Sequence, residues 1–331
     1  KISISQMFPW FGTLNAQEEV AAEMAKARYE MFNDARNRLF FRVRSTYYNL
    51  YVLKEAVRIT DETLNLLGSF WALASIKYES GKAGMVDVLR VEMEIKEMEN
   101  QLAFLKDSEL PLITQFEELL NTKLQQEIAF PDTLWQEDVE MQKSEVMDSI
   151  IAQNPLLKKL DYEMKSWENS IEVARKQGMP SFMLGMSYTS ISERPNMEFA
   201  DNGKDAIMLP QIEVRIPLYR SKYKAMVKEA ELKREAVQSE KENTANQFQT
   251  DFEKAYRDYL DAKRRLKLYK NLLVLSVQAR DILIVDYTSA GKDFEEVLRM
   301  ERKILKYALE LEKARADQNT TVAYISYLMG K

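Results

Sequence analysis

The same helix–turn–helix segment occurs twice in this chain, 209 residues apart. Residues 78–92 align with residues 287–301, and six of the fifteen aligned positions carry the same residue. In each copy a long helical pattern runs in, breaks near glycine, and a second helical pattern runs out. A duplication of this size predicts one long helical hairpin that is used twice, and a repeated unit sets the architecture before any local pattern does.

Apolar residues recur at strict sevens along the first long helical stretch. The stretch from Thr13 to Lys77 has no proline and one glycine, and good helix formers dominate it. Such a column predicts a coiled-coil seam. A helix of about 65 residues is about 100 Å long and needs lateral partners along its length. The first column comprises Val43, Leu50, Val57, Leu64, Trp71 and Tyr78. Shifted by 209 residues it reads Phe252, Tyr259, Leu266, Leu273, Arg280 and Tyr287, and five of these six residues are apolar.

Composition argues against an enzyme. Among its 331 residues the chain has no cysteine and no histidine, which removes thiol nucleophiles, imidazole bases and Cys/His zinc sites. No phosphate-binding loop or metalloprotease motif is present. The 17 methionines read as helix formers and gap fillers, so we expect no metal and no cofactor. A net charge of −5 disfavours nucleic acid as a partner.

The chain divides into six segments by its periodicity and its turn residues. We expect the first strand to open inside an incomplete first repeat, whose N-terminal helix and strand are missing. The expected segments are a strand over 1–12, a first long helical hairpin over 13–124, an irregular equatorial segment over 125–143, a helix over 144–180, a β-hairpin over 181–219 and a second long helical hairpin over 220–331. Pro111 is expected to kink or break the first hairpin.

The predicted β-hairpin has one apolar face and one polar face, and its apolar face must meet a core or lipid. One interpretation is a small sheet packed on the helices of the same chain. The other is a transmembrane barrel, which three strands per chain cannot close, so that several identical subunits contribute. No run of about 20 apolar residues predicts a transmembrane helix. The face predicted to meet lipid comprises Phe182, Leu184, Met186, Tyr188, Ile212, Val214 and Ile216.

These residues carry a resemblance to the TolC-type outer-membrane efflux proteins. The two turns are similar to that family's aromatic-x-x-Gly-x(5)-Asp-Val-Leu pattern, with Ala290 in place of the usual glycine of the second copy and Gly291 beside it. The strand ends at Gln6–Gly12 and Val214–Tyr219 resemble the family's strand-to-helix exits, and the likeness covers essentially the whole chain. The matching positions are Tyr78, Gly81, Asp87, Val88 and Leu89, and Tyr287, Ala290, Glu296, Val297 and Leu298.

The resemblance implies a homotrimer in the outer membrane and periplasm of a Gram-negative bacterium. The strands of the trimer would build one barrel in outer-membrane lipid, and its helices would build a periplasmic α-barrel. A periplasmic adaptor and an inner-membrane pump would be the partners of the trimer. The position of the motif places Asp87, Glu296, Arg90 and Arg299 at the periplasmic aperture. The tip that docks the adaptor would comprise Tyr78, Gly81, Gly84, Tyr287, Ala290 and Gly291.

The expected function is a passive exit duct of a tripartite efflux or secretion system, which exports small molecules or proteins without catalysis. The alternative is a soluble or periplasmic coiled-coil scaffold without channel activity, in which the hairpin packs on its own helices. For Asp87 and Glu296 an ordinary role also stays open, because carboxylates are favoured in the first turn of any helix by the helix dipole.

Overall fold

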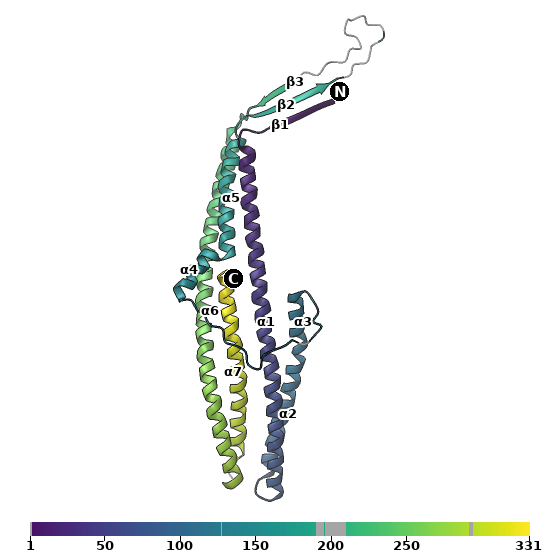
Figure 1. Ribbon diagram of the computed structural model, residues 1–331, viewed down its shortest axis with the longest axis vertical. Helices are drawn as coiled ribbons and strands as arrows, with labels where there is room; N and C mark the ends of the chain where they lie inside the picture. Colours follow the sequence, from purple (N-terminus) through teal and green to yellow (C-terminus); the bar gives the residue numbers. More distant parts are fainter. Residues whose placement is uncertain (1, 127, 190–194, 196–209, 291–293) are drawn as a thin grey trace. The chain divides into compact units, whose positions relative to one another are not determined.

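The computed structural model describes residues 2–126, 128–189, 195, 210–290 and 294–331. The expected mainly helical chain with a few strands is confirmed (Figure 1). Two compact units result, Lys1–Asp34 with Ala152–Gln247 (unit 1) and Ala35–Ile151 with Phe248–Lys331 (unit 2). The elements follow in the order β1 (Ile2–Phe8), α1 (Thr13–Glu79), α2 (Met85–Asp107), α3 (Glu109–Leu120), α4 (Lys143–Gln153), α5 (Pro155–Gln177), β2 (Ser181–Tyr188), β3 (Pro210–Arg215), α6 (Arg220–Ala290) and α7 (Glu295–Leu328).

Unit 1 contains an antiparallel sheet in the strand order β1-β2-β3 (Figure 1). At Gly185 the neighbouring strand comes so close that a Cβ atom would lie 3.1 Å from the Cβ of Ser5, so only glycine fits there without a shift. Strand β3 ends at Arg215, just before Pro217, because proline has no N–H for a sheet ladder. Ile216, expected on the strand face, therefore lies just beyond the strand.

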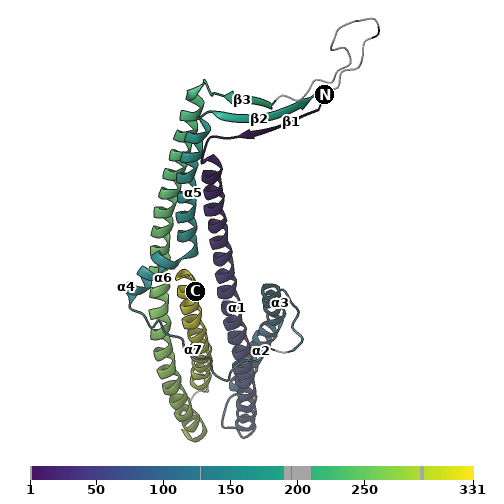
Figure 2. The same ribbon diagram turned by 45° about the horizontal axis from the view of Figure 1, so that its top comes forward.

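The helical part of unit 1 packs α5 beside the first portions of α1 and α6 (Figures 1 and 2). Ser166 Oγ donates to the Val20 carbonyl at 3.2 Å, and Lys241 Nζ lies 2.6 Å from Asp161 Oδ1. The range 144–180, expected as one helix, is two helices. Asn154 separates them, because its side chain caps α5 by accepting from the Leu156 N–H at 2.9 Å and Pro155 follows as the first helical residue.

Unit 2 contains two helical hairpins (Figures 1 and 2). Hairpin 1 is α1 from residue 35 with α2 and α3, and hairpin 2 is α6 from residue 248 with α7. Hairpin 1 breaks between α2 and α3 at Ser108, three residues before Pro111. Proline disrupts the turn that precedes it and is tolerated in the first turn of the helix that follows, which explains the displaced break. Helix α3 ends at Leu120, and the next residue, Asn121, caps it with a left-handed φ of 50°.

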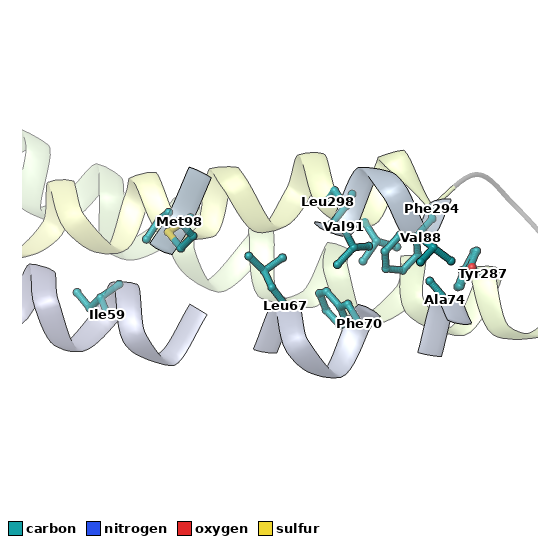
Figure 3. Packing of buried hydrophobic residues seen from close by; sticks show 12 residues of the cluster. Ile59, Leu67, Phe70, Ala74, Val88, Val91, Met98, Tyr287, Phe294 and Leu298 are labelled. Atoms are coloured by element: carbon teal, nitrogen blue, oxygen red, sulfur yellow. The ribbon is translucent and has the colours of Figure 1, made fainter. Parts of the chain in front are cut away.

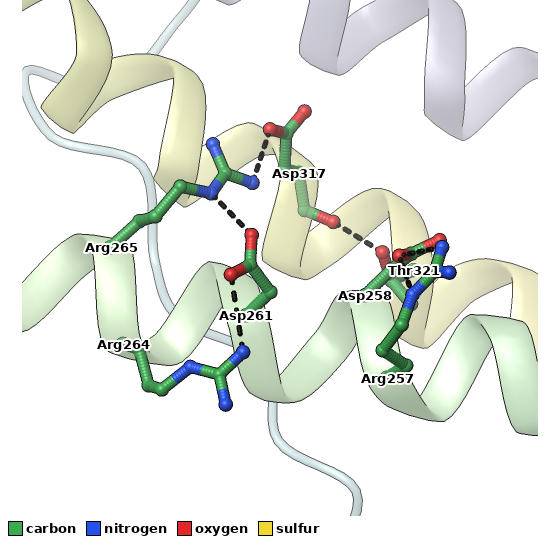
Figure 4. A network of polar contacts seen from close by, with 7 residues as sticks. All are labelled: Arg257, Asp258, Asp261, Arg264, Arg265, Asp317 and Thr321. Atoms are coloured by element: carbon green, nitrogen blue, oxygen red, sulfur yellow. Dashed lines mark hydrogen bonds and ion pairs between the residues drawn. The ribbon is translucent and has the colours of Figure 1, made fainter.

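Ion pairs join the two helices of hairpin 2 on their polar side (Figure 4). Arg265 lies between two carboxylates, with Nε 2.8 Å from Asp261 on its own helix and Nη2 2.8 Å from Asp317 on α7. Asp261 also accepts from Arg264 at 3.2 Å, and hydrogen bonds from these two arginines lower the pKa of its carboxyl. Because all three charged groups keep part of their surface in solvent, each pair contributes only modestly to stability.

Residues 128–142 run across unit 2 without helix or strand, and we call residues 130–142 the belt. The belt is held on α1 by Leu134, which is buried and whose N–H donates to Tyr51 Oη at 3.1 Å. Next to it Nη2 of Arg44 lies 2.7 and 2.6 Å from the two carboxylate oxygens of Glu137, which also accepts from the Tyr48 hydroxyl. Charge-assisted hydrogen bonds are stronger than neutral ones, so the belt is fixed on α1 at this point.

The belt then crosses α7 and α6. Asn319, fully buried on α7, accepts from the Glu137 N–H at 2.9 Å through its side-chain oxygen. Gln318 donates to the Glu137 carbonyl at 2.6 Å, and Tyr259 of α6 donates to Asp138 at 2.7 Å. The equatorial segment expected without regular structure is therefore ordered by buried polar side chains of the helices that it crosses.

Candidate functional site at the hairpin tips and on the sheet

The turn of hairpin 1 is built on two glycines. Helix α1 ends at Glu79, and Gly81 follows in a left-handed conformation with a φ of +69°, which suits glycine best. Its N–H donates to the Tyr78 carbonyl at 2.9 Å. Gly84 is extended and precedes the first residue of α2. These two predicted tip residues thus make the sharp reversal between the helices.

The turn of hairpin 2 lies between the end of α6 at Ala290 and the start of α7 at Glu295. Gly291, predicted as part of the tip, lies outside the described residues, and Ala290 is described only as the last backbone position of α6. Phe294 precedes α7, and its ring is fully buried. The ring packs edge-on against Phe70, with 5.7 Å between centroids, and is tilted against Tyr287, with 4.6 Å between centroids, so this turn is anchored by aromatic packing.

Buried side chains of both hairpins form one apolar core next to the turns (Figure 3). Because this core takes residues from all four helices that enter the two turns, hairpin 1 and hairpin 2 pack against one another within the chain. The core comprises Ile59, Leu67, Phe70, Ala74, Val88, Val91, Met98, Tyr287, Phe294, Val297, Leu298 and Leu305.

The two tyrosines of the repeat have different surroundings. Tyr287 is 2% exposed, whereas its counterpart Tyr78 is 46% exposed. The ammonium group of Lys77, at the end of α1, lies 4.1 Å from the ring centroid of Tyr287 and donates to its carbonyl oxygen. Burial, and then the negative charge of Asp87, raise the pKa of the Tyr287 phenol. The phenol therefore stays neutral and fixes the end of α6 against hairpin 1.

A chain of ion pairs crosses from α2 to α7 beside the core. Arg90 lies 3.6 Å from Asp87 and 3.8 Å from Glu295. Arg302 lies 3.2 Å from Glu295 and 2.7 Å from Glu94, which is buried. These five charges are the tip ion-pair chain. They join the hairpins by alternating signs, and partial burial limits screening by solvent.

The four residues predicted at the aperture fall into two separate groups. Asp87 and Arg90 belong to the tip ion-pair chain, whereas Glu296 pairs with Arg299 on the exposed side of α7. Sequence reasoning missed Glu94, Glu295 and Arg302, which complete the chain. A signal for two of them was present, because Glu295 and Arg302 have opposite charges seven residues apart and so lie on one side of α7.

The sheet of unit 1 presents an apolar face to solvent. The register pairs Phe8 with Phe182 and Phe182 with Val214, and the residues at every second position share this face. Leu184, Ile212 and Val214 are 51%, 73% and 51% exposed. The opposite face carries residues such as Ser3, Ser187 and Glu213. Trp10 stacks on Phe182 at the helical end of the sheet, with 6.2 Å between ring centroids.

Within the described ranges no three His, Cys, Asp or Glu side chains gather so that they could hold a metal ion. None of the described helices is both long enough and apolar enough to cross a membrane.

Comparisons with known proteins agree with this geometry. Residues 1–112 match the family described as outer membrane efflux protein. The fold is similar to a membrane protein from Pseudomonas aeruginosa (TM-score 0.84, 15% identity, 99% of this chain and 76% of that one). It is also similar to CusC, with a TM-score of 0.85, 15% identity and coverage of 98% of this chain and 76% of that one. The outer membrane protein VceC from Vibrio cholerae has a TM-score of 0.81 and 14% identity, with coverage of 99% and 78%. No curated protein sequence matches the chain.

The fold defined by the duplicated hairpins and the small sheet is that of a TolC-type channel. The match to the outer membrane efflux protein family covers residues 1–112, and over the rest of the chain the likeness to solved channels is one of fold. The likeness to TolC-type channels expected from the sequence is thereby confirmed at the level of the fold.

Proposed function

We propose that the chain forms a homotrimeric, passive export channel, in which three sheets share one barrel in outer-membrane lipid and six hairpins form a periplasmic α-barrel. It binds no cofactor and catalyses no reaction. A periplasmic adaptor and an inner-membrane pump bind at the tips of the hairpins. The observation that carries this proposal is that apolar side chains lie exposed both on the sheet and on hairpin 1.

The sheet supports the barrel. Strand β2 is paired on both sides, whereas β1 and β3 each have one edge that pairs with no other strand in the part of the chain that the structure describes. Open edges beside an exposed apolar face are a liability that closed barrels remove. Membrane barrels put apolar side chains towards lipid and polar ones inside, which matches the two faces of this sheet. We therefore assign the apolar face to lipid.

The tips support a ring of copies. In hairpin 2, Tyr287, Phe294 and Leu298 are buried against hairpin 1. Their repeat counterparts on hairpin 1 are Tyr78, Met85 and Leu89, which are 46%, 45% and 46% exposed. We infer that hairpin 1 presents this surface to hairpin 2 of a neighbouring copy, in the same way as hairpin 2 presents its own surface to hairpin 1 within the chain. Contacts of this head-to-tail kind close into rings.

The exposed sheet face also weighs against a scaffold without channel activity. That alternative requires the hairpin of strands to pack its apolar side on helices of the same chain. Ile2, Ile4 and Ile212 are instead 70%, 77% and 73% exposed. Exposed apolar patches of this extent mark a surface that meets a membrane or another protein. The duct interpretation explains the exposure, and the scaffold interpretation leaves it without a partner.

The tip residues receive roles within this proposal. Asp87 and Glu296 line the periplasmic aperture, and Arg90 and Arg299 partly neutralise them. The surface around Tyr78, together with the two turns, binds the adaptor. The pairing with arginine means that each acidic group retains less of its field at the aperture than an isolated carboxylate would.

Reconstitution of the complete protein in planar bilayers tests the proposal. We expect a stable conductance and three subunits per particle by native mass spectrometry in detergent. Val214→Lys places a charge on the lipid face and should block insertion, at roughly 2–4 kcal/mol per charge near the midplane. Ser187→Lys, on the opposite face, is the matched control and should insert. A protein that stays soluble without detergent and conducts nothing, or equal insertion of both variants, would contradict the proposal.

A further inference from the structure

A cavity of about 200 Å³ lies in unit 1, where the sheet meets the helices. The ends of β2 and β3 form one side of it, and residues at the ends of α1, α5 and α6 form the other. Figure 1 shows this region where the three strands run into the helices. We call it the junction cavity, and its lining includes Trp10, Lys176, Ser181, Arg215 and Tyr223.

The junction cavity lies on the polar side of the sheet. The register pairs Ser181 with Arg215, and both residues line the cavity. Residues at every second position share a face, so these two lie on the same face as Ser187 and Glu213. In a membrane barrel the polar face of each strand points inwards. Under the proposed function, the junction cavity therefore faces the lumen of the duct.

The charged side chains that line the junction cavity are both positive. They are Lys176 in the last turn of α5 and Arg215 at the end of β3, and no Asp or Glu of the described ranges lines the cavity. Lys176 forms no ion pair with any described residue. Arg215 lies 3.4 Å from Glu213, but 63% and 50% of these two side chains are exposed, so solvent weakens that pair. The cavity therefore keeps a positive potential.

Three further features favour an anion at this position. A Cβ atom on Gly12 would lie 3.1 Å from the Lys176 ammonium nitrogen, so the missing side chain leaves room for that group beside the turn. Helix α1 begins next to it at Thr13 and has no acidic residue in its first turn, so the positive end of the helix dipole is not neutralised. Ser181 and Tyr223 add hydroxyl groups that can donate to an oxyanion.

The size of the junction cavity limits what it can hold. Sites that enclose a drug-sized molecule have volumes of about 300–1,000 Å³, and this cavity is smaller. Ammonium and guanidinium groups form charge-assisted hydrogen bonds with carboxylates and phosphates. The cavity therefore suits one carboxylate or phosphate group, while the rest of a larger solute stays in the lumen.

We propose that the junction cavity is a weak binding site for carboxylate and phosphate groups on the inner surface of the duct. The lumenal placement rests on the proposed function, in which three copies bring three such sites into one ring. Rings of Lys and Arg side chains favour anions in a pore, and a solute that passes through must also be able to leave. The sites thus concentrate small organic anions and phosphate esters where the barrel meets the helices.

The fluorescence of Trp10 reports on the junction cavity, because this side chain lines it. A reporter protein with Trp71→Phe, Trp135→Phe and Trp167→Phe keeps Trp10 as its one tryptophan. Quenching by iodide, an anion, is compared with quenching by neutral acrylamide in detergent at constant ionic strength. Inorganic phosphate should protect Trp10 from iodide in a saturable way, and chloride at equal ionic strength should protect it less.

Removal of the charge tests the role of Lys176. Lys176→Met should lower the iodide quenching constant roughly two- to threefold, as expected for one charge removed a few ångströms away in a screened site, and should leave acrylamide quenching unchanged. Lys176→Arg keeps the charge and should behave as the parent. Lys228→Met is the matched control, because Lys228 is exposed on α6 outside the cavity and pairs with Glu231. Arg215→Gln repeats the test without a change at Lys176.

Planar bilayers test the placement on the lumen. Lys176→Met combined with Arg215→Gln should shift the reversal potential in a potassium chloride gradient towards that of potassium. The site is refuted if phosphate does not protect Trp10, or if Lys176→Met and Lys228→Met give the same iodide quenching constant. Anion binding without a shift of the reversal potential would overturn the lumenal placement. A protein that conducts nothing contradicts the proposed function instead, while quenching in detergent still decides the site.

Discussion

Replacement of two equivalent leucines should affect stability very differently. Leu298 and Leu89 occupy the same position of the two repeats, yet Leu298 is 0% exposed in the core between the hairpins and Leu89 is 46% exposed. Leu→Ala removes three carbon atoms, worth about 2.4 kcal/mol of transfer free energy at about 0.8 kcal/mol per methylene. At Leu298 a cavity is added, so we expect a loss of about 3–5 kcal/mol. At Leu89 about half of the transfer free energy applies, near 1 kcal/mol.

The difference is measured by urea unfolding, followed by far-UV circular dichroism at a concentration where gel filtration shows single chains. The slope of the unfolding free energy against urea concentration should be the same in both variants, so that the shift in the unfolding midpoint reports the change in stability. Equal shifts for Leu298→Ala and Leu89→Ala would refute the assignment of one buried and one open surface. At concentrations where the protein assembles, the cost of Leu89→Ala should rise, because a neighbouring copy then covers this surface.

Three further predictions concern single groups of unit 2. Burial raises the pKa of Glu301 above its ordinary 4.5, against the opposing charge of Arg280, so the folded chain holds the proton more tightly and stability falls as pH rises from about 4.5. Glu301→Gln should therefore unfold at higher urea than the parent at pH 7 and at a similar urea concentration at pH 4; a parallel pH dependence in both proteins would contradict this. Glu137→Ala removes the pair with Arg44 and should lower the free energy of unfolding by about 1.5–3 kcal/mol. It should also speed proteolysis within the belt. Glu140→Ala, at an exposed position of the same segment, should change neither quantity. Asp87→Asn combined with Glu296→Gln should raise single-channel conductance and weaken block by cations, and an unchanged conductance would remove both residues from the aperture.

The repeat, the long helices and the alternating strands could be predicted from the sequence, because each depends on periodicity along the chain. Helix and strand place side chains at spacings of 3.6 and 2 residues, and the apolar residues record those spacings directly. The absence of proline from α1 and the glycines of its turn were visible in the same way. The pairing partners of Asp87 and Glu296 were accessible too, since Arg90 and Arg299 each lie three residues further along a helix.

Other features depended on which elements meet in space. The seven-residue column predicted similar burial along α1, yet Leu50 is 4% exposed and Trp71 is 43% exposed. A straight helix turns by about 20° per seven residues relative to such a column, so the seam leaves the packed side. The belt was expected to be irregular, and its order comes from Asn319 and Gln318, almost 200 residues away in the sequence.

The contrast between the two repeats defines the limit of the sequence. Tyr78 and Tyr287 have the same residue type and the same neighbouring motif, so nothing local distinguishes them. Only the packing of hairpin 2 on hairpin 1 buries Tyr287 and leaves Tyr78 on the surface. Periodicity along the chain fixed the elements and their duplication. Burial is a property of the space around a side chain, and it was decided by the tertiary contacts alone.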